Sequence, residues 1–289
     1  MTPLTIARQK NMRLIFISII IVLLALPCFA FEPDTHEDFS KSAALIYQKC
    51  TGHAIPDKYI SAFADGAKKE DDPGLTRALN WHFYNNGKKI GHYWKYGLYC
   101  DGSCERIFQA RLDKLESLLA QKKYPVEIYM VAGRIAHYIQ DMGCPPHVAP
   151  IYHVGNDKFD NYESIVRINA DVAQICKEVK EIIGPPELLE QAAQNTLKAI
   201  ESPVVFNNGK TFEGETWKKF WDGPEDKDLP GFKTYGEYGN VFGMVPPCKS
   251  EVCGAYSSEV YDRFYNERYL KAITDTVRLL IYLDNRLQK

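Results

Sequence analysis

The stretch "PVEIYMVAGRIAHYIQDMGCPPH", residues 125–147, contains the strongest indication of the fold. Proline suits the first position of a helix, where its missing N–H would have no intrahelical partner. Residues 125–142 are apolar on most faces, which predicts a helix buried at the centre of the molecule. Pro145 and Pro146 then end this helix and turn the chain.

Other segments show the same 3.6-residue periodicity, and no alternating strand pattern persists. In residues 35–50, Phe39 and Tyr47 share one apolar face, and Asp34 or Thr35 is the expected N-cap. We therefore predict one all-α domain, a multi-helix bundle with long ordered loops at 84–101 and 203–254. The predicted helices cover residues 35–50, 104–123, 125–142, 164–183, 186–201 and 256–287.

The first 30 residues have the features of a secretory signal peptide. Arg13 gives the positive start, Leu14–Leu26 form an apolar run of 13 residues, and Ala30 closes a small-residue cleavage site. That run is too short to span a bilayer comfortably. Cys28 follows a proline, which does not favour a lipid-anchored N-terminus. We predict cleavage after Ala30, a single domain over residues 31–289, and a secreted or periplasmic location.

The charge balance bears on the class of partner. The signal segment contains three of the 35 Lys and Arg residues and none of the 37 acidic residues, so 32 basic residues remain after cleavage. The resulting net charge of about −5 argues against nonspecific binding of polyphosphate chains, which a basic surface favours.

Seven cysteines remain after cleavage, and export makes disulfides the expected state. The pairs closest in sequence, Cys100/Cys104 and Cys248/Cys253, are the first expectation. The odd number leaves at least one free thiol or an intermolecular bond. A thiolate zinc site is the alternative, but the paired C-x-x-C spacing typical of such sites is missing.

The central helix also carries candidate metal ligands. His137 and Asp141 are four residues apart, so their side chains lie on one face of the helix and can hold a single ion. The turn at the two prolines allows His147 to return beside them. A buried histidine that bonds a nearby aspartate is the structural alternative, and the spacing alone does not decide between the two.

Three of the remaining histidines extend this pattern, whereas His53 and His92 have no role in it. Asp71 and Asp72 precede His82 by about ten residues, and the sequence leaves open which of the two is a ligand. His36 lies five residues after the expected new N-terminus, whose amino and carbonyl groups can themselves chelate a metal. His153 is followed by two further aspartates.

The order of these motifs along the chain resembles that in the bacterial zinc-dependent phospholipases C and the fungal single-strand zinc nucleases. Members of this group share an all-α fold with three zinc ions in one cleft. The pattern H-x-x-x-D-x5-H is matched by His137, Asp141 and His147, and the pattern "D…HFY" by Asp71 and residues 82–84.

The group also has an N-terminal residue followed shortly by a histidine, which Phe31 and His36 match. The N-terminal residue of the group is usually tryptophan. Because its ligand atoms belong to the main chain, phenylalanine can provide the same ligands. The resemblance implies up to three zinc ions, the second held by the Phe31 amino and carbonyl groups, His36 and a bridging Asp141. The first would have four side-chain ligands: Asp71, His82, His137 and Asp141.

The third implied site would use His147 with a histidine–carboxylate pair, often H-x-x-x-E in the group. The frame "GNDKFDNY" has Asn156 in the place of the histidine and Asp160 in the place of the glutamate. Asparagine is a poor zinc ligand compared with imidazole. We therefore expect His153 and Asp160 to complete the site, with Asp157 as the second choice.

The resemblance implies hydrolysis of a phosphodiester by a water that the zinc ions activate. Asp71 is expected to accept a proton from that water, a role proposed for the equivalent carboxylate in the phospholipases. We predict a monomer that acts on phospholipid and contacts the membrane surface transiently through its loops. The alternatives are a single-strand nuclease or nucleotidase, with nucleic acid as partner, and a non-catalytic zinc-binding protein.

Aromatic residues near these motifs suit either substrate. They could contact acyl chains or a choline cation, or stack on bases, although ordinary core packing is the alternative for each. These residues are Trp81, Phe83, Tyr84, Tyr93, Trp94 and Tyr138.

Overall fold

Helices dominate the fold, which confirms the predicted all-α class. The fold was obtained as a computed structural model of the whole chain, and the predicted signal segment lies outside the described residues. The structure describes residues 33–71, 80–84, 93–95, 98–121, 124–153, 157–163, 171–229 and 231–288. In chain order its elements are α2 (Pro33–Thr51), α3 (Asp57–Lys69), β1 (Asn80–Phe83), β2 (Tyr93–Lys95), β3 (Leu98–Ser103), α5 (Glu105–Gln121), α6 (Pro125–Asp141), α7 (Pro145–Val148), α8 (Val172–Glu178), α9 (Pro185–Glu201), η1 (Asn207–Gly209), α10 (Lys218–Trp221), α11 (Ser250–Cys253) and α12 (Ser258–Leu287).

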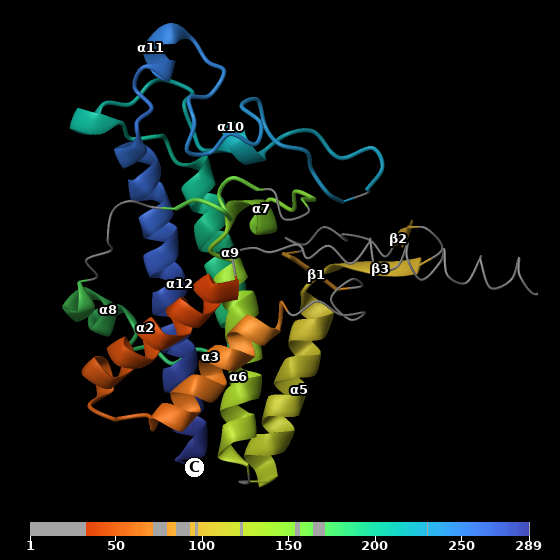
Figure 1. Ribbon diagram of the computed structural model, residues 1–289, viewed down its shortest axis with the longest axis vertical. Coiled ribbons are helices and arrows are strands. Elements are labelled where there is room, and N and C mark those ends of the chain that lie inside the picture. Colours follow the sequence, from red (N-terminus) through yellow and green to blue (C-terminus); the bar gives the residue numbers. More distant parts are fainter. Residues whose placement is uncertain are drawn as a thin grey trace, which may run out of the picture.

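Helix α6 occupies the centre of the bundle, as its apolar sequence predicts. It packs against α3, α5, α9 and α12, and nearly all of it from Ile128 to Asp141 is buried. Helices α2 and α3 cross the long helices α6 and α12 obliquely, and α10 and α11 lie beyond one end of the bundle (Figure 1). None of the helices in the described parts of the chain is long and apolar enough to cross a membrane.

The contact between α3 and α6 depends on two glycines. A Cβ at Gly66 would lie 2.1 Å from the carbonyl oxygen of Met130, and one at Gly133 would lie 2.0 Å from that of Phe63. Both obstructing atoms belong to the backbone, so neither position accepts a side chain without moving a helix. This close approach brings the last turn of α3 next to the candidate ligands on α6.

Several predicted boundaries differ from the structure. Helix α2 begins at Pro33, so neither Asp34 nor Thr35 is its N-cap. Within the predicted segment 164–183, the described helix is only the short α8. Helix α3 was not predicted, because the polar residues of "DKYISAFADGAKK" leave a narrow apolar face.

The predicted loop at 84–101 contains strand β2 and most of strand β3, and β1 lies directly before it. Strand β1 pairs with β3 in parallel, and β2 pairs with β3 antiparallel. Their order is β1–β3–β2, with β3 in the middle. Because each strand has only three to six residues, none shows enough alternation to predict from sequence.

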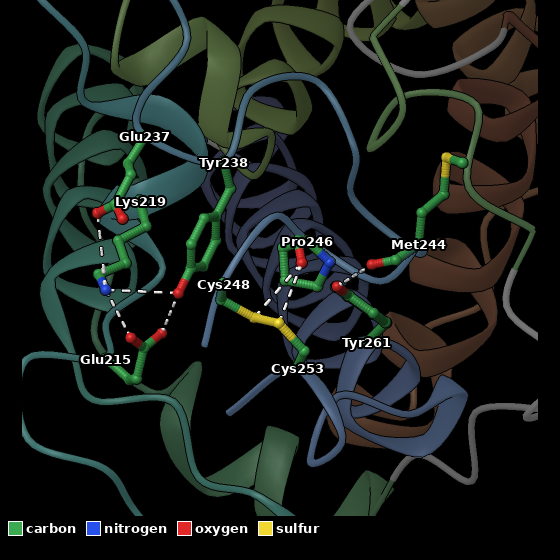
Figure 2. Close-up of a disulfide and its surroundings, with 9 residues drawn as sticks. All are labelled: Glu215, Lys219, Glu237, Tyr238, Met244, Pro246, Cys248, Cys253 and Tyr261. Carbon is green, nitrogen blue, oxygen red and sulfur yellow. Dashed lines mark hydrogen bonds and ion pairs between the residues drawn. A yellow bond between two sulfur atoms is a disulfide. The ribbon is translucent and has the colours of Figure 1, made fainter. Parts of the chain in front are cut away.

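The predicted loop at 203–254 is mostly irregular, with η1 and the one-turn helices α10 and α11. The Tyr238 hydroxyl donates to Glu215 over 2.7 Å, and the Tyr261 hydroxyl donates to the Met244 carbonyl (Figure 2). Buried aromatic side chains pack beneath the segment. Side-chain packing and side-chain hydrogen bonds therefore order this segment in place of regular secondary structure.

Two disulfides join described cysteines. Cys248–Cys253 was predicted and closes a loop beside Pro246 (Figure 2). Cys50–Cys176 was not predicted, because it ties α2 to α8 across 126 residues of sequence. The predicted Cys100–Cys104 pair falls partly outside the described side chains, since that of Cys100 is not described.

Candidate metal centre

Five candidate ligands from four parts of the chain converge at one buried position. His36 comes from α2, Asp71 follows the end of α3, and His82 lies on β1. His137 and Asp141 lie on α6, one turn apart. Each of the five side chains is at most 2% exposed. The structure thus brings together every described residue of the first two predicted sites.

The spacing of the ligand atoms fits metal coordination. Ligands 2.0–2.2 Å from a tetrahedral ion lie roughly 3.3–3.6 Å from one another. His137 Nε2 lies 3.3 Å from Asp141 Oδ2 and 3.6 Å from Asp71 Oδ1, and His36 Nε2 lies 3.4 Å from Asp141 Oδ1. His82 Nδ1 lies somewhat closer, 2.9 Å from Asp141 Oδ2. Buried His and Asp groups in this arrangement can hold a metal ion.

Both carboxylates lie between two sets of histidines. Asp141 turns Oδ1 toward His36 and Oδ2 toward His82 and His137. Asp71 is placed in the same way, with Oδ2 3.7 Å from His36 Nε2 and Oδ1 3.8 Å from His82 Nδ1. Sequence reasoning predicted a bridging position for Asp141 only, whereas the structure places Asp71 equally between the histidines.

Hydrogen bonds orient two of these histidines, His137 and His36. His137 Nδ1 lies 2.9 Å from the Ala67 carbonyl oxygen, and His36 Nδ1 lies 2.8 Å from Gln140 Oε1. A carbonyl oxygen only accepts, so in each pair Nδ1 carries the proton. In the neutral imidazole the lone pair is then on Nε2, which faces the carboxylates. Metal-binding histidines are typically oriented in this way.

A second group lies where the third site was predicted. His153 Nε2 lies 2.9 Å from Asp160 Oδ2, and ligand atoms of Cys144, His147 and Asp160 lie within 4.8 Å of one another. His147 Nδ1 is 2.6 Å from the His82 carbonyl oxygen, and His153 Nδ1 is 2.7 Å from that of Ile151. Both imidazoles therefore also present Nε2 as the ligand atom.

Asp157, the second choice for this site, has a different environment. Its Oδ1 accepts the Phe159 backbone N–H over 2.6 Å, and its Oδ2 accepts the Tyr235 hydroxyl over 2.8 Å. These bonds hold the turn that places Asp160 near His153. Asp160 is the carboxylate that faces the histidine, and burial raises its pKa to about 7 although His153 opposes the shift.

Sequence analysis did not identify two residues that lie next to the candidate ligands, Cys144 and Glu70. Cys144 is fully buried, and its Sγ lies 2.7 Å from Asp160 Oδ1. Its position three residues before His147 could have identified it as a candidate ligand from the sequence. Glu70 precedes Asp71 and accepts hydrogen bonds from Arg111 (2.8 Å), Arg134 (2.6 Å) and the Tyr138 hydroxyl (2.7 Å). No sequence motif distinguishes it from an exposed glutamate.

Three of the aromatic residues proposed to contact substrate belong to the core. Phe83 is fully buried and stacks on His147, with ring centroids 4.9 Å apart. Tyr138 is buried and donates to Glu70, and the buried Tyr84 donates to Glu190. Core packing is therefore the correct interpretation for these three, and the side chains of Trp81, Tyr93 and Trp94 lie outside the described set.

Other residues of the predicted sites also lie outside the described residues, namely Phe31, Asp72 and Asn156. His53, left without a role by the motifs, is exposed and lies 3.2 Å from Asp284. Comparison of the chain with models of protein families, with curated proteins and with solved structures finds no match.

Proposed function

We propose that the protein is a secreted, zinc-dependent hydrolase of phosphodiesters that acts on phospholipid in the manner of a phospholipase C. The observation that carries the proposal is the placement of Asp71 and Asp141. Each presents one oxygen to His36 and the other to His82 and His137, as a carboxylate does when it bridges two ions. Ions held there would lower the pKa of an attacking water and polarise the phosphoryl oxygens.

The chemistry of the ligand atoms favours zinc. Imidazole nitrogens outnumber carboxylates in the first group, and the second group adds the Cys144 thiol. Imidazole and thiolate select zinc over magnesium or calcium, which prefer oxygen ligands. The carbonyl groups that hold each Nδ1 proton also prevent the imidazoles from turning away.

The preference for phospholipid over nucleic acid depends on charge. Without the predicted signal segment the net charge is about −5, and an acidic surface repels a polyphosphate strand more than it repels a single diester. We therefore expect a substrate with one phosphodiester, whose contacts with the protein do not depend on a basic groove.

The experiment is to assay natively purified protein on phosphatidylcholine vesicles and on single-stranded DNA. Each assay is run before and after a chelator, and again after zinc is restored. Asp141→Asn is the test variant and Asp65→Asn, an exposed carboxylate on α3, is the matched control. We expect turnover of phosphatidylcholine that falls on the order of 10²-fold in Asp141→Asn and after chelation, and that zinc restores.

Two results would contradict the proposal. Turnover of DNA without turnover of lipid would assign a nuclease. A protein that retains zinc and turns over neither substrate would be a metal-binding protein without this activity. Asp65→Asn is expected to behave as the wild type in every assay.

A further inference from the structure

A pocket lined by polar and apolar side chains lies away from the metal centre, between α9 and the first half of α12, next to α10. It has a volume of about 360 Å³, within the range of small-molecule sites. Figure 1 shows α9 and α12 side by side, with α10 near their ends. None of the candidate metal ligands lines this pocket.

The charged side chains that line the pocket are mostly basic. Lys198 comes from α9, Arg263 and Arg268 come from α12, and Glu267 is the one acidic side chain in the lining. Within the described parts of the chain, no carboxylate lies within ion-pair distance of any of the three cations. The pocket therefore carries two net positive charges in a protein whose overall net charge is −2.

Arg268 is the most informative of these side chains because it is only 8% exposed. Its Nη1 donates to the side-chain oxygen of Asn195 over 2.8 Å and lies 3.4 Å from the Thr196 hydroxyl. Both partners are neutral, and Nε has no hydrogen-bond partner among the described residues. The charges of Glu267 and Asp275 act favourably on this guanidinium, but neither carboxylate forms a direct ion pair with it. A buried charge without a direct partner is costly, so an anion in the pocket would stabilise the fold.

An aromatic wall holds Arg268 in place. Trp217 and Phe264 stack with ring centroids 4.2 Å apart, and both are at most 5% exposed. The guanidinium carbon of Arg268 lies 5.9 Å from the Phe264 ring centroid. On the open side, Arg263 donates to the Val205 carbonyl, and Lys198 is exposed. The pocket thus combines a fixed buried guanidinium with two accessible cations at its rim.

We propose that this pocket binds a small organic phosphate monoester. A monoester carries close to two negative charges at neutral pH and three acceptor oxygens. That charge equals the net positive charge of the lining, whereas a carboxylate would neutralise only half of it. Guanidinium groups also match phosphate geometry with paired N–H donors. The aromatic wall would contact the organic part, and the site does not depend on the proposed hydrolase reaction.

Phenylphosphonate is a suitable probe because it ionises to a dianion in mildly alkaline buffer and has no ester bond to hydrolyse. Calorimetric titrations would compare the wild type with Lys198→Met, Arg263→Met and Arg268→Met. Lys177→Met, an exposed lysine on α8, is the matched control. Any binding at the metal centre is shared by all of these proteins, so differences between them report on the pocket.

We expect affinity for phenylphosphonate to fall about tenfold or more in Arg268→Met and severalfold in Lys198→Met and Arg263→Met. Lys177→Met should match the wild type. Lys198→Met and Arg263→Met alter exposed side chains at the rim of the pocket and should fold normally. Identical titrations for these two and the wild type would overturn the proposal, and equally tight binding of benzoate or of neutral benzamide would overturn the assignment to phosphate.

Thermal unfolding gives a second readout that a purely structural arginine would not produce. Without ligand, Arg268→Met should have a Tm within about 2 °C of the wild type or above it, because it removes a buried charge that has no direct ion-pair partner among the described residues. Phenylphosphonate should raise the Tm of the wild type more than that of Arg268→Met. Any rise that comes from binding at the metal centre should be the same in both proteins. A lower Tm for Arg268→Met with an undiminished ligand shift would assign Arg268 a structural role only.

Discussion

At the scale of single residues, Asp71 has the position of a ligand that contacts two ions. Both of its oxygens face histidine nitrogens, at 3.6 to 3.8 Å. Asp71→Asn should therefore lose metal and turnover together, because an amide is a weaker ligand than a carboxylate. Metal content and turnover measured on the same preparations check this, with Asp65→Asn as control. Loss of turnover with metal fully retained would instead assign Asp71 the proton-accepting role that the resemblance implies.

Cys144 is expected to contribute a thiolate to the second group. Its Sγ lies 2.7 Å from Asp160, and burial raises the pKa of the thiol well above its ordinary value when no metal is bound. A bound ion would reverse that shift, because thiolates are the form that binds metal. Cobalt-substituted protein should show a near-ultraviolet thiolate-to-cobalt absorption band that Cys144→Ser abolishes. A cobalt spectrum without this band in the wild type would exclude the thiolate ligand.

At the scale of elements, Glu70 joins α3 to α5 and α6. It accepts from Arg111, Arg134 and Tyr138 and is 4% exposed at its side chain. Burial acts to raise the pKa of Glu70, but the hydrogen bond and charge of Arg111, together with the Tyr138 hydrogen bond, hold the pKa below its ordinary value. Glu70→Gln should lower the free energy of unfolding by about 2–4 kcal/mol at pH 7, since it leaves two guanidinium groups without their counter-charge.

The sign of the pKa shift also fixes the pH dependence of this effect. A carboxyl with a lowered folded-state pKa contributes stability above its unfolded pKa, and loses it as pH falls through the folded value. The difference in unfolding free energy between wild type and Glu70→Gln should therefore shrink as pH falls below about 4. Denaturant titrations across this range measure it, and a difference that stays constant would contradict the account.

The elements that sequence predicts best are those with long apolar periodicity. Residues 125–141 and 258–287 are helices close to the predicted ranges. Helix α3 was missed because its apolar face is narrow, and its close contact with α6 at Gly66 and Gly133 adds no apolar side chain that a sequence pattern could show. The backbone contact at these glycines is a tertiary property, and no local propensity encodes it.

The candidate site was predictable where the chain places ligands on one element. His137 and Asp141 follow from helical spacing alone. The preference for Asp160 over Asp157 agrees with the geometry, but its cause lies in a turn held by Tyr235, 78 residues away in sequence. Contacts of this kind, like those of Glu70 with its arginines, depend on the completed fold.

At the scale of the whole molecule, the two disulfides should contribute unequally to stability. Cys50–Cys176 closes a loop of 126 residues and Cys248–Cys253 one of five. Loop-closure entropy predicts stabilisation of about 5 kcal/mol for the first and about 2 kcal/mol for the second. Replacing each pair with serines and measuring unfolding in denaturant tests this, with the short-loop variant as the matched control. Equal losses in the two variants would contradict the entropic account.

Metal content per chain tests the central claim most directly, because the bundle brings together buried side chains that could hold metal ions. Protein purified without chelators should contain about three zinc ions per chain, and Asp141→Asn should lose most of the pair that it contacts. A content of about two would show that the group of Cys144, His147, His153 and Asp160 does not hold an ion. Folded protein without bound metal, which also fails to take up zinc in titration, would contradict the account.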